Sequence, residues 1–212
     1  MKIDTSNAVQ ILLLVGGLSL VPALLFCVTA FSRILIVLSF VRTALATNNT
    51  PPNQILVGIA LFLTLFVMMP TVNAIKSDAW DPLEKGQIST TVAITRAEQP
   101  LRQFMFAQTD DDELSLFVSL AKIPTPKTDG QIPTYVLIPA FIMSEMKTAF
   151  EIGFLVFLPF LIIDLIVSST LMSMGMIMLP PTFISLPFKI LLFVLVDGWA
   201  LITDSLVRSF SG

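Results

Sequence analysis

Histidine is absent from the chain, and cysteine occurs only once, at Cys27. The absence of histidine removes the commonest general base and metal ligand, and a single cysteine cannot form a disulfide within the chain. Charged residues make up only 13% of the sequence, whereas soluble proteins contain about 25%. Because 55% of the residues are hydrophobic, this shortage of charge indicates a membrane protein or a subunit of a large obligate assembly.

Several classes of function find no support in the sequence. The net charge is −3 without a basic patch, so we expect no nucleic-acid partner. There is no Gly-rich phosphate-binding loop and no pairing of a nucleophile with a base. The acidic run Asp110–Glu113 lacks the spacing and the glycine of a calcium-binding loop and is better explained as a helix cap. We therefore expect no catalytic residue, no metal site and no cofactor.

The charges divide the chain into three parts. Residues 1–75 are an N-terminal part of hydrophobic helices, in which only Arg33 and Arg42 are charged after residue 6. Residues 76–135 are an insert that holds more than half of all the charges, and residues 136–212 are hydrophobic again. This pattern predicts hydrophobic helices on either side of a small polar unit.

Two long helices are expected in the N-terminal part. Ala8–Phe31 is long enough to cross a bilayer, and its weakly basic start and its length favour a retained helix over a cleaved signal peptide. Asn48–Asn53 is a polar turn with two prolines. Gln54–Met69 is the second helix, which we expect to end at Pro70.

The insert is predicted to be mainly helical. Ser89 or Thr90 can cap a helix that runs to about Glu98, and Pro100 suits the first turn of the next helix. A run of acids then favours the start of a third helix, at Asp110–Glu113.

The C-terminal part contains apolar helices that proline interrupts. The segments on either side of Pro159 could form a hairpin or one bent helix, and periodicity does not decide between them. The pair Pro180-Pro181 should break the next helix, and Ile184–Val207 continues the apolar pattern.

Four methionines lie within seven residues, at Met172–Met178, beside Gly175 and ahead of Pro180-Pro181. The run is compatible with ordinary helix packing, with a deformable lining of a pore, or with Cu(I) binding by thioethers. No histidine or cysteine accompanies the run, which weakens the copper alternative. The helix-breaking residues favour a loop and hence a deformable lining.

Ionisable side chains lie in or beside the apolar helices. Placing an ionisable group at bilayer depth costs free energy, and such groups usually pair with one another or face water. We therefore expect them to be buried in pairs. They could be static contacts that hold the helices in register, or switchable contacts at a gate or a proton relay. The candidate residues are Arg33, Arg42, Glu145, Lys147, Glu151, Asp164, Lys189 and Asp197.

Specific motifs throughout the apolar sequence give the chain a resemblance to a known family. They are Phe31–Ile34, Val41–Ala44, Thr50–Gln54, Ala60–Met68, Ser144–Phe150, Met172–Met176, Leu186–Lys189 and Leu195–Trp199. With these motifs the chain resembles the FliP/SctR family of type III export-gate proteins, and its flagellar branch more than its injectisome branch. The insert matches this family in position and size more than in sequence.

The resemblance implies an all-α fold, with hydrophobic helical hairpins in a membrane-associated homo-oligomeric ring and a small helical periplasmic insert. It further implies a non-enzymatic protein in the bacterial inner membrane, at the flagellar basal body. Family members form rings of five copies with FliQ and FliR, adjoin other export-apparatus proteins such as FlhB and FlhA, and pass unfolded flagellar proteins.

Two groups of residues match positions to which the family gives a role. Met176, Ile177 and Met178, with Met174 beside them, match a methionine gasket that closes around the channel, although the family commonly has methionine where this chain has Ile177. Glu145 and Lys189 match two charged residues thought to pair between helices.

Two other functions remain open at the level of sequence. A conventional multi-pass transporter would use Asp164 and Lys189 at a midplane site, and a copper-handling membrane protein would use the methionine run. The first predicts a monomer or dimer with a defined solute, and the second predicts stoichiometric Cu(I) binding.

Overall fold

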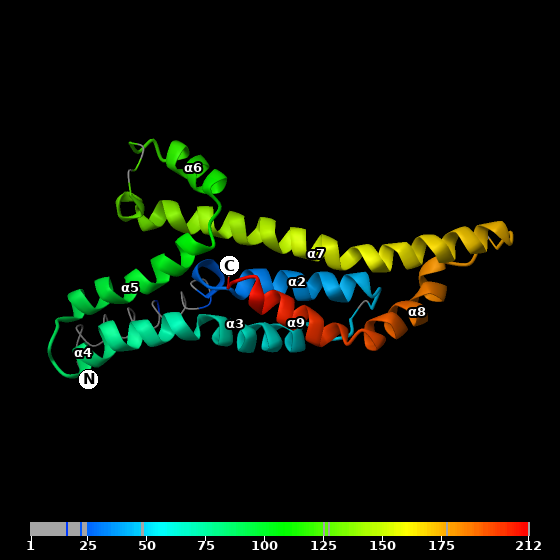
Figure 1. Ribbon diagram of the computed structural model, residues 1–212, viewed down its shortest axis with the longest axis horizontal. Coiled ribbons are helices and arrows are strands. Elements are labelled where there is room, and N and C mark those ends of the chain that lie inside the picture. The colour runs from blue at the N-terminus through cyan, green and yellow to red at the C-terminus, as the bar shows by residue number, and fades with distance from the viewer. Residues whose placement is uncertain are drawn as a thin grey trace, which may run out of the picture. The chain divides into compact units, whose positions relative to one another are not determined.

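The computed structural model describes residues 16, 22, 25–47, 49–124, 126, 128–176 and 178–211. Within these residues every regular element is a helix (Figure 1), which confirms the all-α prediction. The long helix expected over Ala8–Phe31 falls largely outside the described residues. The elements are α2 (Phe31–Ala44), α3 (Asn53–Ile75), the π-helical turn η1 (Lys76–Trp80), α4 (Asp81–Glu84), α5 (Thr90–Ala107), α6 (Asp111–Leu120), the 3-10 turn η2 (Asp129–Gln131), α7 (Thr134–Ser173), α8 (Pro181–Leu195) and α9 (Gly198–Arg208).

The chain forms two compact units. Unit 1 comprises Met1–Ala30 and Ala74–Ile142, and unit 2 comprises Phe31–Asn73 and Met143–Gly212. The N-terminal and C-terminal hydrophobic parts of the sequence therefore pack together in unit 2, which holds both groups of candidate functional residues.

Unit 1 has a small apolar core of its own. Its buried members are Met105, Ile132, Val136, Leu137 and Phe141. The ring of Phe104 meets the ring of Phe141 edge-on, with 5.9 Å between centroids. The insert thus folds around side chains from α5 and the first turns of α7, and hydrophobic burial supplies its main stabilisation.

The helix break expected before Pro100 is wrong, because α5 is one helix with Pro100 inside it. The predicted N-cap is confirmed: the Ser89 hydroxyl accepts the N–H of Val92 at 3.5 Å. Beyond the proline, Arg102 donates to the carbonyl oxygens of Asp129 at 3.1 Å and Ile132 at 2.7 Å. These contacts and the buried Pro100 ring hold the helix together although proline removes one of its hydrogen bonds.

Proline also fails to end two helices of unit 2. The predicted end at Pro70 is wrong, since α3 continues to Ile75. The question left open at Pro159 is decided in favour of one helix, because α7 runs through it for 40 residues. Apolar sequence lies on both sides of each proline, and a helix in apolar surroundings keeps its remaining backbone bonds because no water competes for them.

In unit 2, α2 packs closely on α7. The rings of Phe40 and Phe150 meet edge-on at 5.2 Å. Gly153 lies directly under Phe40, and a Cβ at this glycine would come within 2.6 Å of the Phe40 ring. The absence of a side chain at Gly153 therefore allows the close approach of the two helices.

Two helices of the described chain are long and apolar enough to cross a membrane. They are the segment Asn53–Glu84, which contains α3, and Thr134–Ser173, which is α7. The pair α8 and α9, bent by 63° at their junction, would make a third if it forms one broken span.

Candidate functional site

The methionine run ends α7 in a tight turn. Gly175 has φ of +76°, a left-handed conformation that suits glycine. The N–H of Met176 donates to the carbonyl of Leu171 at 3.0 Å, and the N–H of Gly175 donates to that of Met172 at 3.1 Å. This pair of bonds is a Schellman motif, which satisfies the last carbonyls of a helix. The sequence-based prediction of a loop here is confirmed.

Proline defines the C-terminal end of the loop, where α8 begins. Pro181 occupies the first turn of α8, where its missing N–H would have no helical partner anyway. The loop therefore joins two helices whose ends are both defined by local chemistry, and α7 and α8 meet at it (Figure 1).

The methionine side chains of this loop project away from the chain. Met178 is 97% exposed and Met176 is 40% exposed, and Met172 and Met174 are also exposed. Ordinary core packing within the chain does not account for them. Ile177, the third residue of the expected gasket, lies outside the described residues.

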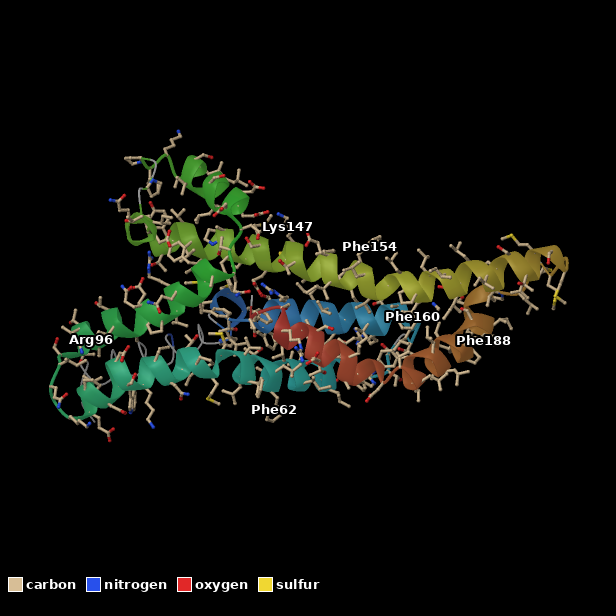
Figure 2. The ribbon with its side chains drawn as sticks, viewed as in Figure 1. Phe62, Arg96, Lys147, Phe154, Phe160 and Phe188 are labelled. Atoms are coloured by element: carbon tan, nitrogen blue, oxygen red, sulfur yellow. The ribbon has the colours of Figure 1, made fainter. Side chains whose placement is uncertain are left out.

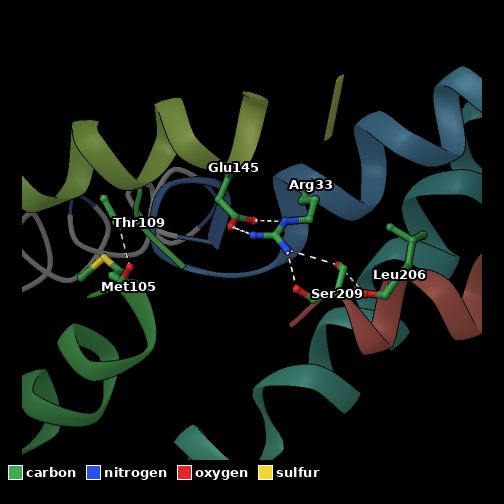
Figure 3. A network of polar contacts seen from close by, with 6 residues as sticks. All are labelled: Arg33, Met105, Thr109, Glu145, Leu206 and Ser209. Carbon is green, nitrogen blue, oxygen red and sulfur yellow. Dashed lines mark hydrogen bonds and ion pairs between the residues drawn. The ribbon is translucent and has the colours of Figure 1, made fainter. Parts of the chain in front are cut away.

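A second feature of unit 2 is a buried ion pair between α2 and α7 (Figure 3). The Arg33 guanidinium donates from Nε to Glu145 Oε2 at 3.0 Å and from a second nitrogen to Glu145 Oε1. Both residues are at most 2% exposed. The paired N–H groups match the two carboxylate oxygens, the strongest arrangement for such a contact.

The same guanidinium also holds the end of α9. Its Nη1 donates to the carbonyl oxygen of Ser209 at 3.0 Å and to the Ser209 hydroxyl at 3.2 Å. The Phe210 ring lies under the guanidinium, with its centroid 4.0 Å from the central carbon. Arg33 thus joins α2, α7 and the end of α9 through one buried cation.

A third contact links α8 to α7 and α2. Lys189 Nζ donates to Asp164 Oδ2 at 2.6 Å and to the Ala44 carbonyl at 3.2 Å. The Ser185 hydroxyl donates to Asp164 Oδ1 at 2.6 Å. Lys189 is buried, whereas the Asp164 side chain keeps 27% of its surface exposed.

The expected pair between Glu145 and Lys189 is wrong within the chain. Glu145 pairs with Arg33, and Lys189 pairs with Asp164. A buried charge needs an oppositely charged partner because its desolvation costs free energy. Which helix provides that partner depends on how the helices pack. The predicted burial of Arg33 is confirmed, but no sequence pattern indicates Glu145 as its partner.

Four other expected buried charges differ from the prediction. Lys147 and Glu151 are exposed on α7. Asp197 is exposed, because it has φ of +50° and forms the corner between α8 and α9; aspartate tolerates this conformation better than most residues. Arg42 is half-buried and donates to Asn53 Oδ1 and to the Pro51 carbonyl. It fixes the turn between α2 and α3 rather than a charge pair.

Some residues of these contacts were missed by sequence reasoning. Ser209 and Phe210 lie beyond the last apolar segment, and no pattern marks them. Ser185 could have been found, because it lies four residues before Lys189 and so shares a helix face with it. Within the described residues, no group of three or more His, Cys, Asp or Glu side chains could hold a metal ion.

Comparison with known proteins identifies the family. The family model described as "FliP family" matches residues 14–206. The chain is 55% identical to the flagellar biosynthetic protein FliP of Bacillus subtilis over 98% of this chain and 94% of that protein. It is 54% identical to the protein of that name from Pectobacterium carotovorum, over 96% and 79% of the two chains, and 53% identical to that of Treponema pallidum, over 98% and 77%. The chain therefore belongs to the FliP family.

Proposed function

We propose that the chain is a pore-forming subunit of the flagellar type III export gate, which passes unfolded flagellar proteins across the bacterial inner membrane. The observation that carries the proposal is the methionine loop between α7 and α8, in which Met174, Met176 and Met178 are exposed although they are apolar. An apolar loop of this kind needs an apolar environment, which neighbouring copies around a channel would provide.

The partners that we propose for this chain are those that membership of the FliP family implies. We infer that about five copies of this chain form a ring together with FliQ and FliR. This ring would adjoin FlhB and FlhA in the flagellar basal body. The exposed apolar surface of unit 2, which extends over α3, α7 and α8, is far larger than the scattered exposed apolar residues of ordinary soluble monomers. The insert, with its own core and most of the charges, would lie on the periplasmic side.

The proposed mechanism is passive and steric. Methionine is unbranched and makes few directional demands, so a ring formed by Met174, Met176, Ile177 and Met178 can close on itself and repack around a passing chain of any sequence. Ion pairs within each copy would keep the helices that carry the loop in place. The subunit acts without enzymatic chemistry, and energy would come from other components.

The test is the double substitution of Met176→Ala and Met178→Ala in the assembled complex. Removing two flexible side chains from each copy should open the closed gate, so leakage of small ions or dyes through the membrane should rise while protein export continues at least in part. Met69→Ala is a matched control, because Met69 is exposed to a similar extent, 42%, but lies on α3. A double variant that stays as tight as the parent would contradict the gasket role.

The two other functions make different predictions. In a transporter, Asp164 and Lys189 would need to be available to a solute, yet they bind each other, Ser185 and the Ala44 carbonyl. The mass of the complex in detergent would separate a multi-copy gate from a small transporter. Titration with Cu(I) should be silent for the gate, whereas stoichiometric binding would support copper handling.

A further inference from the structure

Two helices of the chain end in the same way, one at the methionine loop and one in the insert. The Schellman motif at the end of α7 has Gly175 as its left-handed residue. After α4, the N–H of Gly86 donates to the Leu83 carbonyl at 3.0 Å, and the N–H of Gln87 donates to the Pro82 carbonyl at 2.9 Å. This is the same motif, with φ of +68° at Gly86 and +76° at Gly175. The chain therefore contains a matched pair of helix ends capped by glycine, one in each unit.

Position 175 requires glycine for its backbone conformation and not for space. A Cβ at Gly175 would meet no atom within 4 Å beyond its immediate chain neighbours. The left-handed region that is open to residues with a side chain extends from about +50° to +70° in φ, and the +76° of Gly175 lies beyond it. Among the described residues other than glycine, those with positive φ are Ala46, Lys122 and Asp197, at +50° to +57°. A side chain at position 175 would therefore change φ without causing a clash.

A change in φ at Gly175 moves the rest of the loop. A change from +76° to the +57° of Ala46 rotates the chain that follows by about 20°. Met178 lies three residues further on, at most about 10 Å along the chain, so its backbone moves by up to about 3 Å. A water molecule is about 2.8 Å across. In a ring that repeats the change in every copy, a shift of this size is enough to open a path for water and ions.

The turn at Gly175 also separates two methionines of the loop. The N–H of Met176 is bonded to the carbonyl of Leu171, and Schellman motifs commonly bring the side chains at these two positions together. Leu171 is buried and Met176 is the less exposed methionine, at 40% against 97% for Met178. Figure 2 shows sulfur atoms that project from the ribbon where α7 meets α8. Gly175 thus holds Met176 at the end of α7 and directs Met178 outward.

The surroundings of the two glycine caps differ. The end of α4 is exposed in the charged insert, where water can replace a hydrogen bond that the cap loses. In the closed apolar ring of the proposed function, the carbonyls at the end of α7 would have no such substitute. A loss of the left-handed conformation should therefore matter more at Gly175 than at Gly86.

We propose that Gly175 is a positioning residue of the gate, whose left-handed conformation places Met176 and Met178 where they close against neighbouring copies. The inference rests on the proposed gasket role. It adds that the seal depends on the backbone of a residue that contributes no side chain to it.

The test measures the efflux of a small encapsulated dye from phosphatidylcholine vesicles that contain the assembled complex. Gly175→Ala should raise the rate of efflux by about three- to tenfold, because a residue with a Cβ populates the left-handed conformation about tenfold less than glycine. Gly175→Asn should leak less than Gly175→Ala, since asparagine tolerates this conformation better. Gly86→Ala is the matched control: it strains the same motif, again with no atom within 4 Å of the new Cβ, and should leave efflux at the parental rate.

The double variant Met176→Ala with Met178→Ala, measured in the same vesicles, separates this inference from the gasket role. If the double variant leaks and Gly175→Ala stays tight, the role of Gly175 is overturned and the gasket stands. If the double variant stays tight, the gasket role fails and this inference fails with it. Equal efflux from Gly175→Ala and Gly175→Asn, or from Gly175→Ala and Gly86→Ala, would also overturn the role of Gly175.

Mixed complexes cover the case in which Gly175→Ala alone does not assemble. Coexpression with the parental chain gives rings in which only some copies carry the substitution, and efflux should rise with the fraction of substituted chains. Efflux that is independent of this fraction would contradict the proposal.

Discussion

The two units of the chain differ in which side chains they bury and which they expose. Unit 1 buries a compact apolar core around Phe141 and keeps most of its charges on the surface. Unit 2 exposes many phenylalanines and methionines and buries three charged side chains, Arg33, Glu145 and Lys189, although other charges of the unit stay exposed. Unit 1 is suited to water, whereas the exposed apolar surface of unit 2 is suited to apolar neighbours, and each charge that unit 2 buries needs a partner within the unit.

The largest expected effect is that of Arg33→Ala in unit 2. The substitution leaves Glu145 buried without its cation and releases Ser209, so the free energy of unfolding should fall by about 3–5 kcal/mol. Denaturation of the purified protein in detergent measures the change. Arg208→Ala is the control, because its ion pair with Asp204 is exposed and should contribute little to stability. Similar losses for the two variants would refute the contrast between buried and exposed pairs.

A second experiment on the buried pair replaces both of its partners with apolar residues. Arg33→Met combined with Glu145→Leu removes both charges, so the double variant should be markedly more stable than Arg33→Ala. The same denaturation experiment provides the measurement. A double variant as unstable as the single one would mean that the hydrogen bonds to Ser209, rather than the desolvated Glu145, determine the loss.

Lys189→Met should have a smaller effect. The methionine keeps most of the apolar volume, but Asp164 loses its cation and the Ala44 carbonyl loses a donor. Since the Asp164 side chain is partly exposed and retains Ser185, the loss should be about 1.5–3 kcal/mol, typical of a hydrogen bond to a charged group. A loss as large as that of Arg33→Ala would show that Asp164 is fully desolvated in the assembly.

Gly198→Ala tests the corner between α8 and α9. A Cβ here would lie 2.3 Å from the Phe193 ring, which also meets Trp199 edge-on at 5.2 Å. The ring must shift, so stability should fall by about 1–3 kcal/mol, and the near-ultraviolet circular dichroism of Trp199 should change. Adding Phe193→Leu should recover part of the loss. An unchanged spectrum would mean that Phe193 is free to move.

Ser89→Ala gives the smallest effect and belongs to unit 1. Loss of the N-cap of α5 should lower the free energy of unfolding by about 1 kcal/mol. Because the cap is exposed to water, this loss should be the same in detergent and in lipid vesicles, in contrast to the variants of unit 2. A strong dependence on lipid would place this part of the insert against the membrane.

Sequence reasoning succeeded where local chemistry decides. The turn at Gly175 and the break at Pro180-Pro181 follow from backbone preferences, and the sequence predicts both, although it places the start of the next helix at Ile184 rather than at Pro181. It failed at Pro70 and Pro100, where the helix continues through the proline although proline removes one backbone hydrogen bond. The roles assigned by resemblance to Met176 and Met178 stay predictions, and the exposure of both side chains is consistent with them.

Composition and local sequence are enough to predict the helical class, the apolar character of the chain, the position of the methionine loop and the need for buried charges to pair. These properties depend on composition and on neighbours a few residues apart. The pairing of Glu145 with Arg33 and of Lys189 with Asp164 is seen only in the folded chain. The partners come from separate helices, so their meeting depends on how each helix is rotated and packed, which no local pattern encodes.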